Sequence, residues 1–182
     1  MKVCGYRDAR ADGAFWWVET PFASDVAQVK VNFASLEAKG GGDDPESLLD
    51  ALWKLAKTPA ANRGEVAGES MWRHHREANR FVIVFTDASC HRTTSIPEAP
   101  GAGFDDVARE VMASRLRLSV YCPEADCYSE LAQMDRCEIE FVGYLSDTTI
   151  KLEKWLSESD FMGYLARQLR RQDPPPGIAI DF

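Results

Sequence analysis

The chain is short of positive charge and contains no long apolar run. It carries 21 Lys and Arg against 29 Asp and Glu, which gives a formal net charge of -8. Because phosphate binding needs clustered cations that displace counterions, this balance argues against a nucleic-acid partner. No apolar stretch approaches the ~20 residues that span a bilayer, and residues 1–5 do not lead into a signal peptide. We therefore expect a cytoplasmic chain that binds neither nucleic acid nor membrane.

Paired C-x-x-C spacing is also missing. The five cysteines are Cys4, Cys90, Cys122, Cys127 and Cys137. An odd set without paired spacing is typical of neither a disulfide framework nor a zinc knuckle, so we expect reduced thiols. A zinc site made from Cys122, Cys127 and Cys137 is disfavoured, because the spacing is irregular and no His lies nearby in sequence.

The length and composition predict one domain with a sizeable core. The 182 residues are 45% hydrophobic and include 9 Phe and 5 Trp. No internal repeat or domain linker interrupts them, and we assign residues 1–172 to one domain. Pro174-Pro175-Pro176 ends the last expected helix and places residues 173–182 in a Pro-rich tail.

The first third of the chain predicts a hairpin and a helix. Residues 3–8 and 14–22 are dense in aromatic and β-branched residues, and Asp12-Gly13 between them suits a turn. Ser24 can cap a helix over residues 25–39, whose apolar side chains fall near one stripe. A second helix should follow the three glycines and end near Lys57.

The rest of the chain alternates strands with helices. The unbroken apolar run at residues 80–86 is typical of a central parallel strand covered on both faces. After it we expect a loop at 89–103, a helix at 104–114, a strand at 116–122, a helix at 128–134, a strand at 138–142 and one or two helices at 149–172. This order predicts an α/β fold, a three-layer doubly wound (Rossmann-like) and mostly parallel sheet with helices on both faces.

Two short segments place acidic oxygens where an element begins or ends. Gly40-Gly41-Gly42-Asp43-Asp44-Pro45-Glu46 opens the second helix, and Phe81-Val82-Ile83-Val84-Phe85-Thr86-Asp87-Ala88 ends an apolar strand in a carboxylate. In an open α/β sheet the ligand crevice lies at such ends of the strands. Helix capping is a sufficient explanation for Asp44, whereas for Glu46 a favourable helix dipole and a functional role are both open. Asp87 is harder to explain structurally, because a carboxylate directly after a buried strand is costly unless something pairs with it.

Together with Val3-Cys4-Gly5-Tyr6-Arg7-Asp8, these segments resemble the von Willebrand factor A family. The likeness is strongest to the branch with Gly-Gly-Gly-Asp-x-Pro-Glu and Phe-Thr-Asp-Ala signatures, which the I-like domain of the integrin β subunit approximates. Residues 3–8 look like the family's second strand, and the order of elements matches up to Gln172. The resemblance implies a metal-ion-dependent adhesion site on the sheet's top edge, where Mg²⁺ or Mn²⁺ binds a partner's carboxylate.

In that scheme Asp87 and Glu46 match metal ligands, and Asp43 resembles a ligand of a neighbouring calcium position. Oxygen ligands of this kind suit hard divalent cations. We expect Asp44, Thr86 and Ser89 to form a partner-binding rim beside them. Thr86 either hydrogen-bonds locally or holds a metal-bound water, and the local bond is favoured.

One part of the family pattern is missing from this sequence. The family's site is built chiefly from an Asp-x-Ser-x-Ser motif after the first strand, and no such motif occurs here. The missing strand would be the central one, between residues 3–8 and 80–86. Its absence leaves buried backbone groups unpaired unless the neighbours close up or another chain inserts a strand. Three explanations remain open. The chain is a fragment or has a mis-set start, which is the explanation that we favour. Alternatively, it is a degenerate domain, or a partner supplies the missing strand.

We therefore expect a non-catalytic protein–protein interaction module with a partial or degenerate metal site. Mg²⁺ or Mn²⁺ binding should be weak or absent, and the partner should be another protein that offers an acidic side chain or an inserted strand. The rival hypothesis is a metal-assisted, phosphoesterase-like hydrolase that uses Asp43, Glu46 and Asp87 as its cation cage. It lacks a visible nucleophile and a phosphate-binding glycine loop. Cys90 and His91 do not supply the nucleophile, because adjacent residues rarely face each other as thiol and base.

Overall fold

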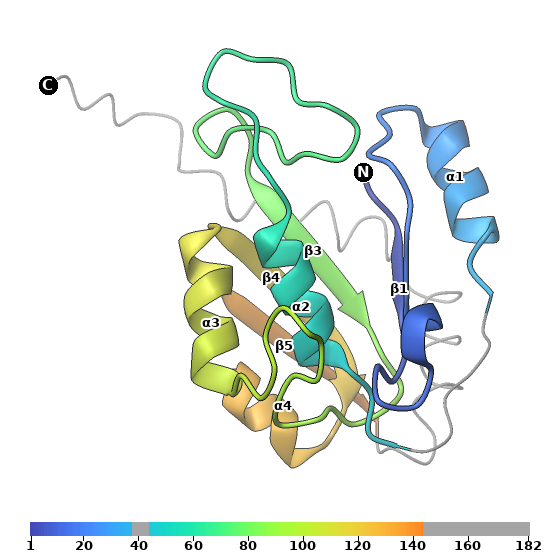
Figure 1. Ribbon diagram of the computed structural model, residues 1–182, viewed down its shortest axis with the longest axis vertical. Helices are drawn as coiled ribbons and strands as arrows, with labels where there is room; N and C mark the ends of the chain where they lie inside the picture. The colour runs from blue at the N-terminus through green and yellow to red at the C-terminus, as the bar shows by residue number, and fades with distance from the viewer. Residues whose placement is uncertain (38–43, 144–182) are drawn as a thin grey trace, which may run out of the picture.

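The computed structural model of the chain describes residues 1–37 and 44–143 (Figure 1). Its elements in chain order are β1 (Cys4–Tyr6), the 3-10 turn η1 (Gly13–Phe15), β2 (Trp17–Glu19), α1 (Val26–Ala34), α2 (Leu48–Lys57), β3 (Arg80–Phe85), α3 (Phe104–Ala113), β4 (Leu116–Pro123), α4 (Asp126–Leu131) and β5 (Cys137–Gly143). The strands form an antiparallel pair β1-β2 and a parallel sheet of order β3-β4-β5. This part of the chain therefore has an α/β fold with a three-stranded parallel sheet. None of the helices within it is both long and apolar enough to cross a membrane.

The centre of the parallel sheet is β4. Val120 pairs with Val84 of β3 on one side and with Ile139 of β5 on the other. Every residue from Leu118 to Cys122 is buried, whereas β3 alternates between buried and half-buried residues. The prediction of a central strand at residues 80–86 is therefore wrong for the described sheet. The polar Arg117 and Ser119 made β4 look less buried in sequence than it is.

Three helices cover one face of this sheet. The strand order advances in one direction, so right-handed crossovers place α3 and α4 on the same side. The side chains of Leu52 from α2, Val107 from α3 and Tyr128 from α4 are all fully buried in one cluster with Val120. Figure 1 shows α2 and α3 lying side by side over the strands. The helices expected at residues 149–172 and the tail at 173–182 lie outside the described residues.

The hairpin predicted for the start of the chain is confirmed. Gly5 of β1 pairs with Val18 of β2 in antiparallel register. Among the described strands, β1 and β3 belong to different sheets and do not pair with each other. The family's missing strand would lie between β1 and β3, and these two strands do not close up to replace it.

Helix α1 differs from its prediction at both ends. Its N-cap is Asp25 and not Ser24, because the two carboxylate oxygens of Asp25 accept hydrogen bonds from the amides of Ala27 and Gln28, at 3.2 and 3.3 Å. The helix ends at Ala34, and the only buried residue in it is Asn32. The expected apolar stripe does not pack against the sheet, since Val26 and Phe33 are 69% and 52% exposed.

Helix α2 begins three residues later than predicted. Asp44 was expected to be its N-cap, but the cap position belongs to Ser47, and the side chain of Asp44 binds elsewhere. The reason is that residues before the helix run alongside the loop after β3, where Glu46 and Cys90 form a parallel bridge. The apolar face of α2 is confirmed, with Leu52 wholly buried.

If β4 is the centre of the core, shortening Val120 should destabilise the protein strongly. Val120 is 0% exposed and Val66 is 98% exposed, so the same Val→Ala change can be made in both environments. We expect Val120→Ala to lower the free energy of unfolding by about 2–3 kcal/mol, and Val66→Ala to change it by less than about 0.5 kcal/mol. Urea denaturation measures both. Equal effects of the two substitutions would contradict the assigned core.

Candidate functional site

Two loops meet at the carboxyl end of β3. The backbone N–H of Glu46 donates to the carbonyl of Ser89 at 2.9 Å, and the N–H of His91 donates to the carbonyl of Glu46 at 3.0 Å. These bonds flank the bridge between Glu46 and Cys90. The segment before α2 is therefore fixed against the segment after β3, and Glu46 and Asp87 are brought to one edge of the molecule.

Glu46 lies in an environment that favours its neutral form. Its side chain is half-buried, and within the described residues its Oε2 atom is buried without a hydrogen-bond partner. Burial raises the pKa of Glu46 to about 7, and the negative charges of four neighbouring carboxylates add to the shift. These carboxylates are Asp8, Asp12, Asp87 and Asp44. A bound proton or cation would therefore relieve the unfavourable charge at this position.

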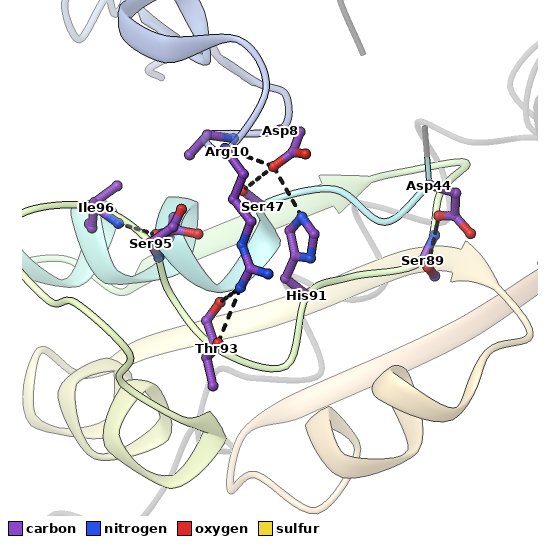
Figure 2. Close-up of polar contacts among 11 residues, drawn as sticks. Asp8, Arg10, Asp44, Ser47, Ser89, His91, Thr93, Ser95 and Ile96 are labelled. Carbon is purple, nitrogen blue, oxygen red and sulfur yellow. Dashed lines mark hydrogen bonds and ion pairs between the residues drawn. The ribbon is translucent and has the colours of Figure 1, made fainter. Parts of the chain in front are cut away.

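Asp8 organises the other side of the edge, and sequence reasoning did not single it out. Its Oδ1 accepts hydrogen bonds from the backbone of Arg10 at 2.9 Å, from His91 Nε2 at 3.0 Å and from Ser47 Oγ at 3.2 Å (Figure 2). Burial opposes ionisation of Asp8, but the bonds from Arg10 and His91 outweigh it and hold the pKa of Asp8 below its ordinary value. His91 therefore pairs with Asp8 and not with its neighbour Cys90. The signal for Asp8 was its place at the end of the segment that resembles the family's second strand.

Asp44 and Ser89, both expected in the partner-binding rim, bind each other. The Ser89 backbone N–H and hydroxyl both donate to Asp44 Oδ1, at 2.5 and 2.7 Å (Figure 2). Tyr128 of α4 donates to the carbonyl of Ala88 at 2.6 Å. The loop after β3 is thus held from two sides, and the helix-cap role predicted for Asp44 is replaced by this contact.

Thr86 and Asp87 follow directly on β3 and differ in exposure. Thr86 is buried, and its N–H donates to the carbonyl of Tyr121 at 3.0 Å, which extends the sheet by one residue. Asp87 is exposed, and its charge contributes to the raised pKa of Glu46. Burial raises the pKa of the Tyr6 hydroxyl. The Thr86 hydroxyl opposes this rise. The local hydrogen bond expected for the Thr86 side chain stays a prediction.

A second buried carboxylate shapes the longer loop at residues 89–103. Asp50 of α2 is 0% exposed, and its Oδ1 accepts the backbone N–H groups of Ser95 and Ile96 at 2.7 and 2.9 Å. Asp50 was not singled out from the sequence. The available signal was its position between Leu49 and the apolar residues that follow, on the face that packs into the core.

The described residues do not complete a metal site. In residues 1–37 and 44–143 no group of three or more His, Cys, Asp or Glu side chains is arranged to hold a metal ion, and this includes the zinc candidate Cys122, Cys127 and Cys137. Asp43 lies outside the described residues. Glu46 and Asp87 offer the oxygen ligands that Mg²⁺ prefers, but two carboxylates underfill its octahedral coordination. The two carboxylates are thus the right type of ligand for such a cation, but they are too few to complete its coordination.

The structure thus gathers Glu46, Asp87, Asp44, Ser89 and Thr86 at one edge, with Asp8 and His91 beside them. No protein-family model matches the chain, and no curated protein is similar to it.

The raised pKa of Glu46 makes folding stability depend on pH. Glu46 takes up its proton near pH 7 in the folded chain and near 4.5 when unfolded, so its carboxylate opposes folding increasingly as pH rises from 4.5 to 7. Gln cannot ionise, and we expect Glu46→Gln to melt at a higher temperature than the unchanged chain above pH 7. The gain should shrink as pH falls and vanish near 4.5.

Thermal unfolding followed by circular dichroism across this pH range gives the comparison. The matched control is Glu98→Gln, in an exposed part of the 89–103 loop, which should melt in parallel with the unchanged chain at every pH. A gain in Glu46→Gln that does not vary with pH would show that Glu46 has an ordinary environment.

Proposed function

We propose that this chain is a non-catalytic protein-interaction domain of the von Willebrand factor A type, and that its contact edge is built from residues 44–47 and 86–91. The observation that carries the proposal is the backbone pairing of Glu46 with Ser89 and His91, which sets the carboxylates of Glu46 and Asp87 at the carboxyl end of a parallel strand. That end is where open α/β sheets bind ligands. Glu46 and Asp87, which belong to two of the segments that resemble the family, both lie at this edge.

The contact edge is also pre-formed. This favours partner binding, because the loop after β3 does not have to find its bound conformation. Asp44, Tyr128 and Asp8 each hold one residue of the loop after β3 by a side-chain hydrogen bond. A loop fixed before association has less conformational freedom to lose on binding. Such an arrangement suits a docking surface, where geometry matters more than chemical reactivity.

We assign the metal-ion-dependent adhesion site of the family to this edge in an incomplete form. Glu46 and Asp87 would hold Mg²⁺ or Mn²⁺, and the bound cation would supply a positive charge for an acidic side chain of the partner. Asp43 is the third ligand that the resemblance suggests. Because the cation must displace the proton of Glu46, binding should weaken as pH falls below 7.

The partner protein can engage the domain in a second way that needs no metal. Within the described part of the chain, β1 and β3 are strands of separate sheets, and β3 is at the end of its sheet. An extended segment of a partner could add to such an edge through main-chain hydrogen bonds. We retain this strand-addition mode beside the acidic-side-chain mode, since a chelator distinguishes them.

Metal affinity is the first test. We expect calorimetry to give a Mg²⁺ dissociation constant in the millimolar range or no binding at all, because two carboxylates leave most of the coordination to water. Any heat that is seen should disappear in Asp87→Asn and persist in Asp105→Asn, which changes an exposed carboxylate on α3. Micromolar Mg²⁺ binding that is lost in Glu46→Ala would contradict an incomplete site.

Partner binding is the second test. Peptides selected by display against the chain in Mn²⁺ should bind at least about tenfold more weakly to Glu46→Gln and Asp87→Asn, since loss of a contact to a charged group costs about 2–5 kcal/mol. Asp105→Asn is again the control. Binding that survives both a chelator and the two edge variants indicates strand addition. Hydrolysis of a small phosphomonoester with Mg²⁺ or Mn²⁺, abolished by Asp87→Ala, would contradict a non-catalytic function.

A further inference from the structure

Two cysteines that are distant in sequence meet behind the contact edge. Cys90 lies in the loop after β3, and Cys127 lies in α4. The backbone N–H of Cys90 donates to Cys127 Sγ at 3.1 Å. Both are free thiols; Cys90 is buried and Cys127 is half-buried. The Cys127 sulfur therefore lies against the backbone of Cys90, and Cys127 is the more exposed of the two residues.

The surroundings of this pair stabilise negative charge on one sulfur. The hydrogen bond from the Cys90 thiol is the main cause that lowers the pKa of Cys127 to about 7; burial opposes it, and the Cys90 N–H and the Arg92 guanidinium add to it. Arg92 is itself held by an ion pair with Glu130, also on α4. A thiolate that accepts a backbone N–H near a cation is the environment of reactive cysteines.

The other three cysteines have the opposite environment. Burial raises the pKa of Cys4 to about 11 and those of Cys122 and Cys137 to about 12. A thiol with a pKa this high is almost wholly protonated at neutral pH and is a poor nucleophile. The chain therefore carries an internal comparison for the reactivity of Cys127.

We propose that Cys127 and Cys90 are a peroxide-reactive thiol pair, in which Cys127 attacks the peroxide and Cys90 then closes a disulfide with it. This inference rests on the hydrogen bond that joins Cys90 to the Cys127 sulfur and not on the metal or partner binding proposed above. It assigns a modification site to residues that the contact edge uses only for support.

The chemistry needs one equivalent of a hydroperoxide as oxidant. The Cys127 thiolate attacks one peroxide oxygen, so that an S–O bond forms, the O–O bond breaks, and the departing oxygen leaves as water or an alcohol after taking a proton. The Cys90 sulfur then attacks the sulfenic sulfur of Cys127; the S–S bond forms, the S–O bond breaks, and hydroxide leaves with the Cys90 proton as water. Two thiols are oxidised by two electrons, and the peroxide is reduced by two.

The order of the two steps follows from the same contacts. Cys127 is the more exposed sulfur and the one stabilised as thiolate. The hydrogen-bonded side chain of Cys127 is the largest cause of the raised pKa of Cys90, with burial next. Cys90 is buried, so the more exposed Cys127 meets the peroxide first and Cys90 takes the second step.

The disulfide would connect α4 to the contact edge. Cys90 forms the bridge with Glu46 and stands between Ser89, which binds Asp44, and His91, which binds Asp8. A covalent bond at Cys90 would therefore restrain both hydrogen-bonded neighbours. Peroxide would act on the same loop that carries the proposed binding residues.

Peroxide treatment of the full folded chain, followed by alkylation of the remaining thiols and peptide mapping, tests the pair. We expect one disulfide, between Cys90 and Cys127, while Cys4, Cys122 and Cys137 stay alkylatable. In Cys90→Ser, dimedone should label Cys127 as a trapped sulfenic acid. In Cys127→Ser no disulfide to Cys90 should form, and Cys137→Ser should behave as the unchanged chain.

A variant outside the core keeps the test decisive if Cys90→Ser fails to fold. The side chain of Arg92 is 61% exposed, so Arg92→Gln should leave the fold intact and slow the reaction of Cys127 with peroxide by about two- to tenfold at neutral pH, whereas Arg92→Lys should keep most of the rate. The proposal is overturned if Cys127 reacts no faster than Cys4 in the folded chain. It is overturned equally if oxidation links any other pair of cysteines first.

Discussion

The short pairing of Glu46 with the loop after β3 is the constraint on which the rest of the site depends. Two backbone hydrogen bonds, from Glu46 to Ser89 and from His91 to Glu46, join segments that are more than forty residues apart in the chain. They delay the start of α2, direct Asp44 to Ser89, and set the carboxylate of Glu46 among four others. The backbone geometry therefore creates the unfavourable electrostatic environment of the Glu46 carboxylate. A bound proton or cation can relieve it.

The same pairing relates the carboxylate edge to the thiol pair. Cys90 is the bridge partner of Glu46 on one side and the hydrogen-bond partner of Cys127 on the other. The loop after β3 thus carries Asp87 of the proposed contact edge and Cys90 of the proposed thiol pair, and Tyr128 and Cys127 of α4 hold this loop from behind. A change at α4 reaches the edge through contacts that are already made, and no rearrangement of the sheet is needed.

Much of the fold could be predicted from the sequence, because apolar periodicity and turn residues act locally. The hairpin, the α2 core face and the β3-α3-β4 order were predicted correctly, whereas the convergence of the Glu46 and Asp87 carboxylates stays a prediction. The errors arose where long-range contacts override local preference. Asp44 is a good helix cap in isolation but binds Ser89, and Asp50 looks like a surface residue but binds the backbone of Ser95. Pairing of Cys90 with Cys127 depends on tertiary structure alone, so their spacing gave no signal.

The proposed contact edge requires that the carboxylates of Glu46 and Asp87 converge closely enough to share one electrostatic environment. Its most direct test is an NMR titration of the Glu46 side-chain carboxyl in the unchanged chain and in Asp87→Asn. We expect a pKa of about 7 for Glu46 in the unchanged chain, and a lower pKa for Glu46 once the charge of Asp87 is removed. A pKa near the ordinary 4.5 that does not respond to the substitution at Asp87 would contradict it.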